Sequence, residues 1–96
     1  MEFAWDPAKA EANLAKHGLS FAEASELLAG DADYLEIHDD TQDREDRFIA
    51  IGPIRRGVIV VVFTERENDV VRIISAREAT RREAQLFRNH EASRHE

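Results

Sequence analysis

The segment Val58–Glu65 constrains the fold most, because six of its eight residues are β-branched. Such residues favour strands, and the lack of polar alternation predicts a central strand that is buried on both faces. Two further strand segments, Arg47–Gly52 and Val70–Ala76, flank it. Turns at Pro53–Gly57 and Glu67–Asp69 separate the three segments. Since these connections are short, we expect an antiparallel meander rather than crossover connections.

Two helices are expected before this sheet. Asp6 has the character of an N-cap and Pro7 suits the first helical position, so a helix is predicted from Pro7 to about His17, with Gly18 as its left-handed end. Ser20–Glu23 matches a capping box, which predicts a second helix through about Ala29.

The remaining elements complete an α+β chain. Phe3–Trp5 and Tyr34–His38 are predicted strands, and Thr80–Glu83 is a second capping box that opens a last helix. The tail His90–Glu96 has no apolar pattern and is expected to fray. The predicted order is β-α-α-β-β-β-β-α, with two N-terminal helices and a C-terminal helix packed on an antiparallel sheet. A length of 96 residues allows one domain.

The charge is polarised along the chain. The net charge is −7, and Asp31–Asp46 alone carries eight acids and one arginine. Arg47–Arg88 carries nine arginines and five acids, a local surplus of positive charge. Such a chain can present a basic face to one partner and an acidic loop to another.

Composition also bounds the compartment and the class of site. There is no cysteine, which excludes disulfides and thiolate metal sites and fits a reducing compartment. The N-terminal segment lacks the pattern of a signal peptide, and the longest apolar run, Val58–Phe63, is too short to cross a bilayer. We therefore expect a cytoplasmic protein.

Four blocks in this order resemble the BrnT family of toxins. They cover roughly Phe3 to Phe87, nearly the whole chain, and their joint order and spacing make a chance match improbable. The blocks are Trp5–Lys9 with Asn13, Lys16–Leu19 and Phe21; Asp46–Gly52; Val61–Arg66 with Arg72–Arg77; and Ala79 with Arg82 and Glu83.

The resemblance implies a fold, an activity and a partner. BrnT proteins are RelE-like ribonuclease toxins of type II toxin–antitoxin systems. Their antitoxin, BrnA, carries a ribbon-helix-helix DNA-binding domain, and the complex represses its own operon. By this resemblance we expect an endoribonuclease that cleaves mRNA, and a heterotetramer that contacts DNA only through a BrnA-like antitoxin. The alternative is a catalytically weak RelE-like binding module that acts as co-repressor.

Metal-independent RNA cleavage needs a base for the 2′-hydroxyl, an acid for the leaving oxygen, and cations for the phosphorane. No metal or other cofactor is expected, because the four histidines are scattered and the acids of the loop lack calcium-loop spacing. Lys16 and His17 are the first candidates, Lys16 as a phosphate ligand and His17 as an acid–base group. The alternative is that both only complement the last carbonyls of their helix.

Arginines on the strands are the next candidates. With a four-residue turn after Glu65, Thr64 and Arg66 share a face with Ser75 and Arg77, while Arg72 points the other way. A bulge or a shifted turn would change this split. Arg66 and Arg77 are therefore predicted catalytic phosphate ligands, and Arg72 a weaker RNA contact. The alternative is cross-strand ion pairing with Glu65 or Asp46.

Three other arginines are candidate RNA ligands. Arg81 and Arg82 open the last helix, where a cation opposes the helix dipole, so a contact with RNA or the antitoxin would explain them. Salt bridges to Glu78 or Glu83 would explain them equally well. Arg47 can either close onto the acidic loop or face the cleft.

Overall fold

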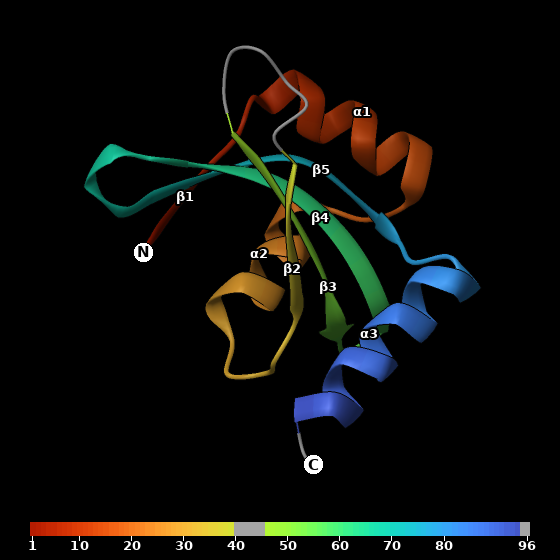
Figure 1. Ribbon diagram of the computed structural model, residues 1–96. Coiled ribbons are helices and arrows are strands. Elements are labelled where there is room, and N and C mark those ends of the chain that lie inside the picture. The colour runs from red at the N-terminus through yellow and green to blue at the C-terminus, as the bar shows by residue number, and fades with distance from the viewer. Residues whose placement is uncertain (40–45, 95–96) are drawn as a thin grey trace.

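The structure, a computed structural model, describes residues 1–39 and 46–94, apart from the side chain of Arg66 (Figure 1). Its centre is a five-stranded sheet in the order β1-β5-β4-β3-β2. The four strands from β2 to β5 pair antiparallel, as expected, and β1 joins the edge of β5 in parallel. The strands are β1 Glu2–Ala4, β2 Leu35–Asp39, β3 Arg47–Ile54, β4 Gly57–Arg66 and β5 Val70–Glu78.

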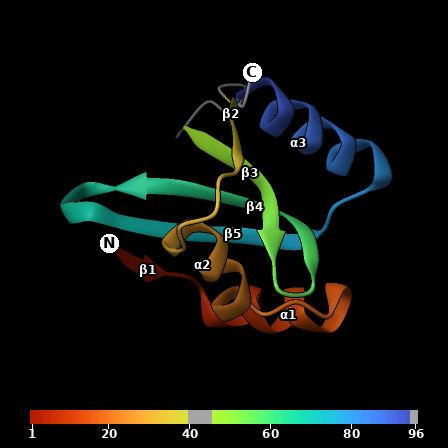
Figure 2. The same ribbon diagram turned by 90° about the horizontal axis from the view of Figure 1, so that it is seen from below.

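Three α-helices cover the two faces of this sheet. Helices α1 (Pro7–His17) and α2 (Phe21–Ala29) lie on one face, and α3 (Arg81–Arg94) lies on the other (Figure 2). The α+β fold and its element order are thereby confirmed. Helix α3 continues through Arg94, further than the sequence pattern predicted. Most of the expected acidic loop, Asp39–Asp46, falls outside the described residues.

The long strand β4 is the central strand that its composition predicts. It is hydrogen-bonded to β3 on one side and to β5 on the other. Ile59, Val61 and Phe63 are buried with α1, α2 and the segment that joins them, whereas Val60 packs with Phe87 of α3. The two faces of one strand thus serve two separate apolar clusters, so β4 holds both helical layers in place.

The helix ends follow their predicted local chemistry. The Asp6 carboxylate accepts a hydrogen bond from the Ala8 amide at 2.9 Å, and Gly18 ends α1 with a left-handed φ of 67°. Ser20 and Glu23 form the capping box of α2. At α3, the Thr80 amide donates to the Glu83 carboxylate at 2.8 Å and the Glu83 amide donates to the Thr80 hydroxyl at 3.2 Å.

The β4–β5 hairpin differs from the expected register in two places. Its turn holds three residues, Glu67–Asp69, so Thr64 pairs with Arg72 rather than with Val71. A bulge then adds one β5 residue between Ile73, which pairs with Phe63, and Ser75, which pairs with Val62. The prediction that Arg72 points away from Thr64 was therefore wrong.

The bulge has a second consequence. Arg77 is five positions after Arg72, an odd spacing that would put the two side chains on opposite faces of a regular strand. Because of the bulge, Arg77 pairs with Val60, a residue of the α3 side. Both arginines therefore lie on the face that carries α3.

Candidate functional site

A polar cluster lies on the α3 side of the sheet, at the end of β4 near the hairpin. Its members are Arg47, Thr64 and Arg72, here called the Arg47–Arg72 cluster. Arg72 pairs directly with Thr64, and Arg47 precedes Phe48, which pairs with Phe63, the residue before Thr64. In an antiparallel ladder these positions share one face, so three neighbouring strands each contribute one polar side chain.

Two atoms of this cluster are buried without a hydrogen-bond partner. Thr64 is only 2% exposed, and among the residues that the structure describes neither its Oγ1 nor the buried Nε of Arg47 has a hydrogen-bond partner. Leaving such groups unpaired costs free energy, so buried polar atoms usually have partners. A guanidinium and a hydroxyl are donors that suit an oxygen of a phosphate group.

Arg72 completes the positive charge of the cluster. It is half-buried, and no ion pair or hydrogen bond of its side chain is found within residues 1–39 and 46–94. The residue opposite Arg47 on β2 is Asp39, an acid that moderates the local charge. The backbone of Arg66 pairs with Val70 at the far end of β4.

Arg77, in contrast, is held by the start of α3. Its guanidinium donates two hydrogen bonds to the carboxylate of Glu83, at 2.7 and 2.8 Å, and a third to the carbonyl of Glu78 at 3.3 Å. The bond to Glu83 raises the pKa of Arg77, and the same bond is the main cause that lowers the pKa of Glu83 to about 2. Ion pairing, the alternative considered for the strand arginines, thus occurs at Arg77 with a partner on α3.

Lys16 and His17 are the last two residues of α1. This helix lies on the face of the sheet opposite α3 (Figure 2), whereas the Arg47–Arg72 cluster lies on the α3 face. Lys16 is exposed and His17 is half-buried. At this end of the molecule, Arg56 connects the α1–α2 segment to the end of β5. Its guanidinium donates to the Gly18 carbonyl at 2.9 Å and forms ion pairs with Glu23 at 3.3 Å and Glu78 at 3.5 Å.

Arg81 and Arg82 are exposed at the start of α3, which lies at the same end of the molecule as the end of α1 (Figures 1 and 2). Glu78 pairs with Arg56 and Glu83 pairs with Arg77, so neither acid is paired with Arg81 or Arg82. In the described part of the chain these two arginines have no ion pair.

The predicted catalytic residues therefore do not form one constellation. Arg77 pairs with Val60, six residues before Arg66 along β4, which corresponds to about 20 Å of strand. Two separate cationic regions result. One is the Arg47–Arg72 cluster near the hairpin, and the other is the end that carries Lys16, His17, Arg81 and Arg82.

Comparisons with known proteins identify the family. Residues 5–83 match the family described as the ribonuclease toxin, BrnT, of type II toxin–antitoxin systems. This chain belongs to the BrnT family. Among solved structures, the crystal structure of the Brucella abortus ribonuclease toxin BrnT is similar, with 30% identity and a TM-score of 0.62; the match covers 84% of this chain and 99% of that chain. No curated protein sequence matches significantly.

Asn13 shows why a residue of the BrnT-like motif matters to the fold. It is 8% exposed, and its amide nitrogen donates to the carbonyls of Leu19 at 3.0 Å and Ala76 at 2.7 Å. Its amide oxygen accepts from the Ala76 amide at 3.1 Å. The side chain thus fastens α1 to β5. A polar residue between Ala10 and Leu14 was the available signal, and sequence reasoning assigned it no role.

Two further findings bear on the class of site in this BrnT-family chain. Within the described ranges, no group of three or more histidine, aspartate or glutamate side chains is arranged to hold a metal ion. Over the same ranges, no helix has the length and apolar character needed to cross a membrane.

Proposed function

We propose that this BrnT-family chain cleaves messenger RNA without a metal ion, and that it inhibits translation by doing so. The observation that carries this proposal is the Arg47–Arg72 cluster on one face of the sheet, where two buried donors and the Arg72 guanidinium have no partner within residues 1–39 and 46–94. The family description as a ribonuclease toxin supports an RNA phosphate as the group bound there.

The chemistry of the cluster suits charge stabilisation. As the 2′-hydroxyl attacks the phosphorus, its proton passes to water, the bond to the 5′-oxygen breaks and that oxygen takes a proton from water, while the non-bridging oxygens gain negative charge. Arg47 and Arg72 would stabilise that charge, and the Thr64 hydroxyl would donate to one oxygen. His17 lies behind the sheet, so we propose it and Lys16 as contacts for a more distant part of the RNA, together with Arg81 and Arg82.

The acidic net charge is compatible with this function, because the cluster provides a local cationic surface. We propose further that a BrnA-like ribbon-helix-helix antitoxin neutralises the chain in the cytoplasm. A heterotetramer would follow from dimerisation of the antitoxin, and DNA would be contacted only through it. Membership of a type II toxin–antitoxin family supports an antitoxin partner.

The separation of the predicted catalytic residues favours a second reading. A catalytically weak domain that serves mainly as co-repressor needs no constellation of Lys16, His17, Arg66 and Arg77. Expression of the chain without its antitoxin distinguishes the two hypotheses. A ribonuclease would arrest growth and deplete mRNA, whereas a co-repressor would do neither.

The test compares purified wild-type chain with Arg72→Met, Thr64→Val and the matched control Arg88→Met. Arg88 is an exposed arginine of α3 without an ion pair among the described residues. We expect Arg72→Met to cleave RNA on the order of 100-fold more slowly, Thr64→Val to lose a smaller factor, and Arg88→Met to be unchanged. Equal rates for all four proteins, each shown to be folded by circular dichroism, would refute the proposed site. Undetectable cleavage by the wild type, with antitoxin binding retained, would favour the co-repressor.

A further inference from the structure

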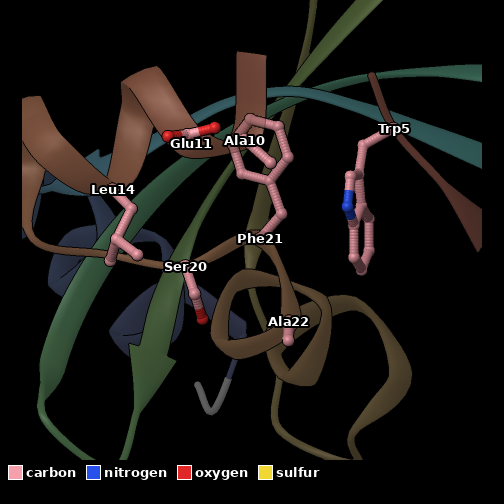
Figure 3. Close-up of a pocket in the computed structure, with 7 residues that line it drawn as sticks. All are labelled: Trp5, Ala10, Glu11, Leu14, Ser20, Phe21 and Ala22. Atoms are coloured by element: carbon pink, nitrogen blue, oxygen red, sulfur yellow. The ribbon is translucent and has the colours of Figure 1, made fainter. Parts of the chain in front are cut away.

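A hollow of about 260 Å³ lies between α1 and α2, and Figure 3 shows the residues that line it. These two helices cover the face of the sheet opposite α3 (Figure 2), so the hollow is on the side away from the Arg47–Arg72 cluster. Its lining is mainly apolar and comes from both helices, from the residue that follows β1 and from the N-cap of α2. The lining residues are Trp5, Ala10, Glu11, Leu14, Ser20, Phe21 and Ala22.

Part of the apolar lining of the hollow is exposed to solvent. Leu14 is 49% exposed although it lies beside a buried aromatic, Phe21. Trp5 packs edge-on against Phe21 at a ring distance of 6.0 Å and is itself only half-buried. A half-buried Trp and a half-exposed Leu beside one opening are typical of a surface that receives a partner.

Two polar groups flank this apolar floor. The carboxylate of Glu11 lies at one side of the opening, and the Trp5 indole nitrogen is on the ring edge that faces the other lining residues (Figure 3). Neither side chain has a hydrogen bond or ion pair within the part of the chain that the structure describes. The hollow thus offers an acceptor with negative charge and a donor on either side of an apolar centre.

The size indicates the kind of occupant. Sites that enclose small molecules usually span about 300–1,000 Å³, so this hollow is better matched to one or two side chains. It also runs between two helices, and an amphipathic helix can place anchors at i and i+3 or i+4 into such a groove.

We propose that the α1–α2 hollow anchors an amphipathic helix of the antitoxin, with apolar side chains against Leu14 and Trp5 and a lysine or arginine opposite Glu11. This inference rests on the proposed toxin function. Charge complementarity favours such a partner over a second copy, because two copies would bring a net charge of −7 and a Glu11 carboxylate each. Since the hollow and the Arg47–Arg72 cluster lie on opposite sides of the sheet, antitoxin affinity and RNA cleavage are separable by mutation.

The experiment uses the purified full-length chain and, as probe, the purified product of the small gene next to its own. Ala22→Arg fills the hollow with a cation, and Ala29→Arg is the matched control, because Ala29 is an exposed alanine of the same helix outside the hollow. Glu11→Arg, which reverses the charge at the opening, is the second variant. Calorimetric titration gives the antitoxin affinity, RNA cleavage gives the activity, and circular dichroism checks the fold.

We expect Ala22→Arg and Glu11→Arg to weaken antitoxin binding at least about tenfold while cleavage and melting temperature stay at the wild-type level, and Ala29→Arg to match wild type. Unchanged affinity of both hollow variants would overturn the inference and leave the ribonuclease function intact. A free-chain dimer that Ala22→Arg dissociates in sedimentation would also overturn it, in favour of self-association. If the wild type does not bind the antitoxin at all, the result would refute both the proposed partner and this inference.

Discussion

Arg77 of β5 and Glu83 of α3 are joined by two parallel hydrogen bonds of 2.7 and 2.8 Å. The same carboxylate accepts the Thr80 amide of the capping box. One acid therefore closes the start of α3 and ties it to the end of the sheet. Arg77 therefore has a structural partner within the chain, whereas the sequence predicted that it would bind an RNA phosphate.

A pair of substitutions separates the two roles of Arg77. If it positions α3, Arg77→Met and Glu83→Gln should lower the free energy of unfolding by a similar amount, about 1 kcal/mol for a pair that is partly exposed to solvent. RNA cleavage should change little in either variant. If Arg77 binds phosphate and Glu83 only competes for it, Arg77→Met should abolish cleavage and Glu83→Gln should increase it. Urea unfolding and a cleavage assay on the same preparations decide between the two.

Asn13 is expected to be among the polar residues most important for stability. Asn13→Ala leaves the amide and carbonyl of Ala76 and the carbonyl of Leu19 without their partner, so we expect a loss of about 2–4 kcal/mol in the free energy of unfolding. Asn13→Asp should be no better, because its carboxylate would face two carbonyl oxygens. Asn89→Ala, at an exposed position of α3, should stay within about 0.5 kcal/mol of wild type. A loss at Asn13 no larger than at Asn89 would contradict this account.

Gly52 is required by the close packing of β3 against its neighbours. A Cβ at this position would lie 2.7 Å from the Tyr34 Cβ and 2.8 Å from the Leu27 Cδ1. Gly52→Ala should therefore cost about 1–3 kcal/mol of unfolding free energy through overpacking. Shortening Leu27 to valine in the same chain should recover only part of that loss, since the contact with Tyr34 involves an atom fixed to the backbone. Thermal unfolding of the three proteins measures both effects, and a fully stable Gly52→Ala would show that the neighbours move apart.

Local signals in the sequence were sufficient for most of the fold. The Ser20–Glu23 and Thr80–Glu83 capping boxes and the β-branched run of β4 act over a few residues, and each formed as expected. The register of the β4–β5 hairpin was not predictable in the same way. The three-residue turn changed the face assigned to Arg72, and the bulge after Ile73 placed Arg77 on that same face; no signal in the sequence specified either one.

In the candidate site, too, the local sequence predicts some features and tertiary contacts determine the others. Composition identified arginines as the chemistry-bearing residues, but their partners are set by tertiary contacts. Arg77 meets Glu83 across the strand–helix connection, and Arg56, to which no role was assigned, bridges Gly18, Glu23 and Glu78. Nothing in the local sequence distinguishes Arg56 from its exposed neighbour Arg55. The Arg47–Arg72 cluster likewise depends on three strands that only the folded sheet brings together.

The pH dependence of stability follows from the Glu83 carboxylate. Its pKa is about 2 in the folded chain and 4.5 ordinarily, with the Arg77 hydrogen bonds as the main cause. Because the folded pKa is the lower of the two, the stabilisation is fully present above about pH 4.5 and is lost as the pH falls through that value toward 2. Wild type should therefore exceed Glu83→Gln in stability at pH 7, and the difference should shrink steadily between pH 5 and pH 2.

Glu91→Gln, at an exposed site on the same helix, should differ little from wild type throughout. Urea denaturation at a series of pH values measures these differences. A gap between wild type and Glu83→Gln that stays constant down to the lowest pH would mean that the Glu83 charge does not contribute to folding.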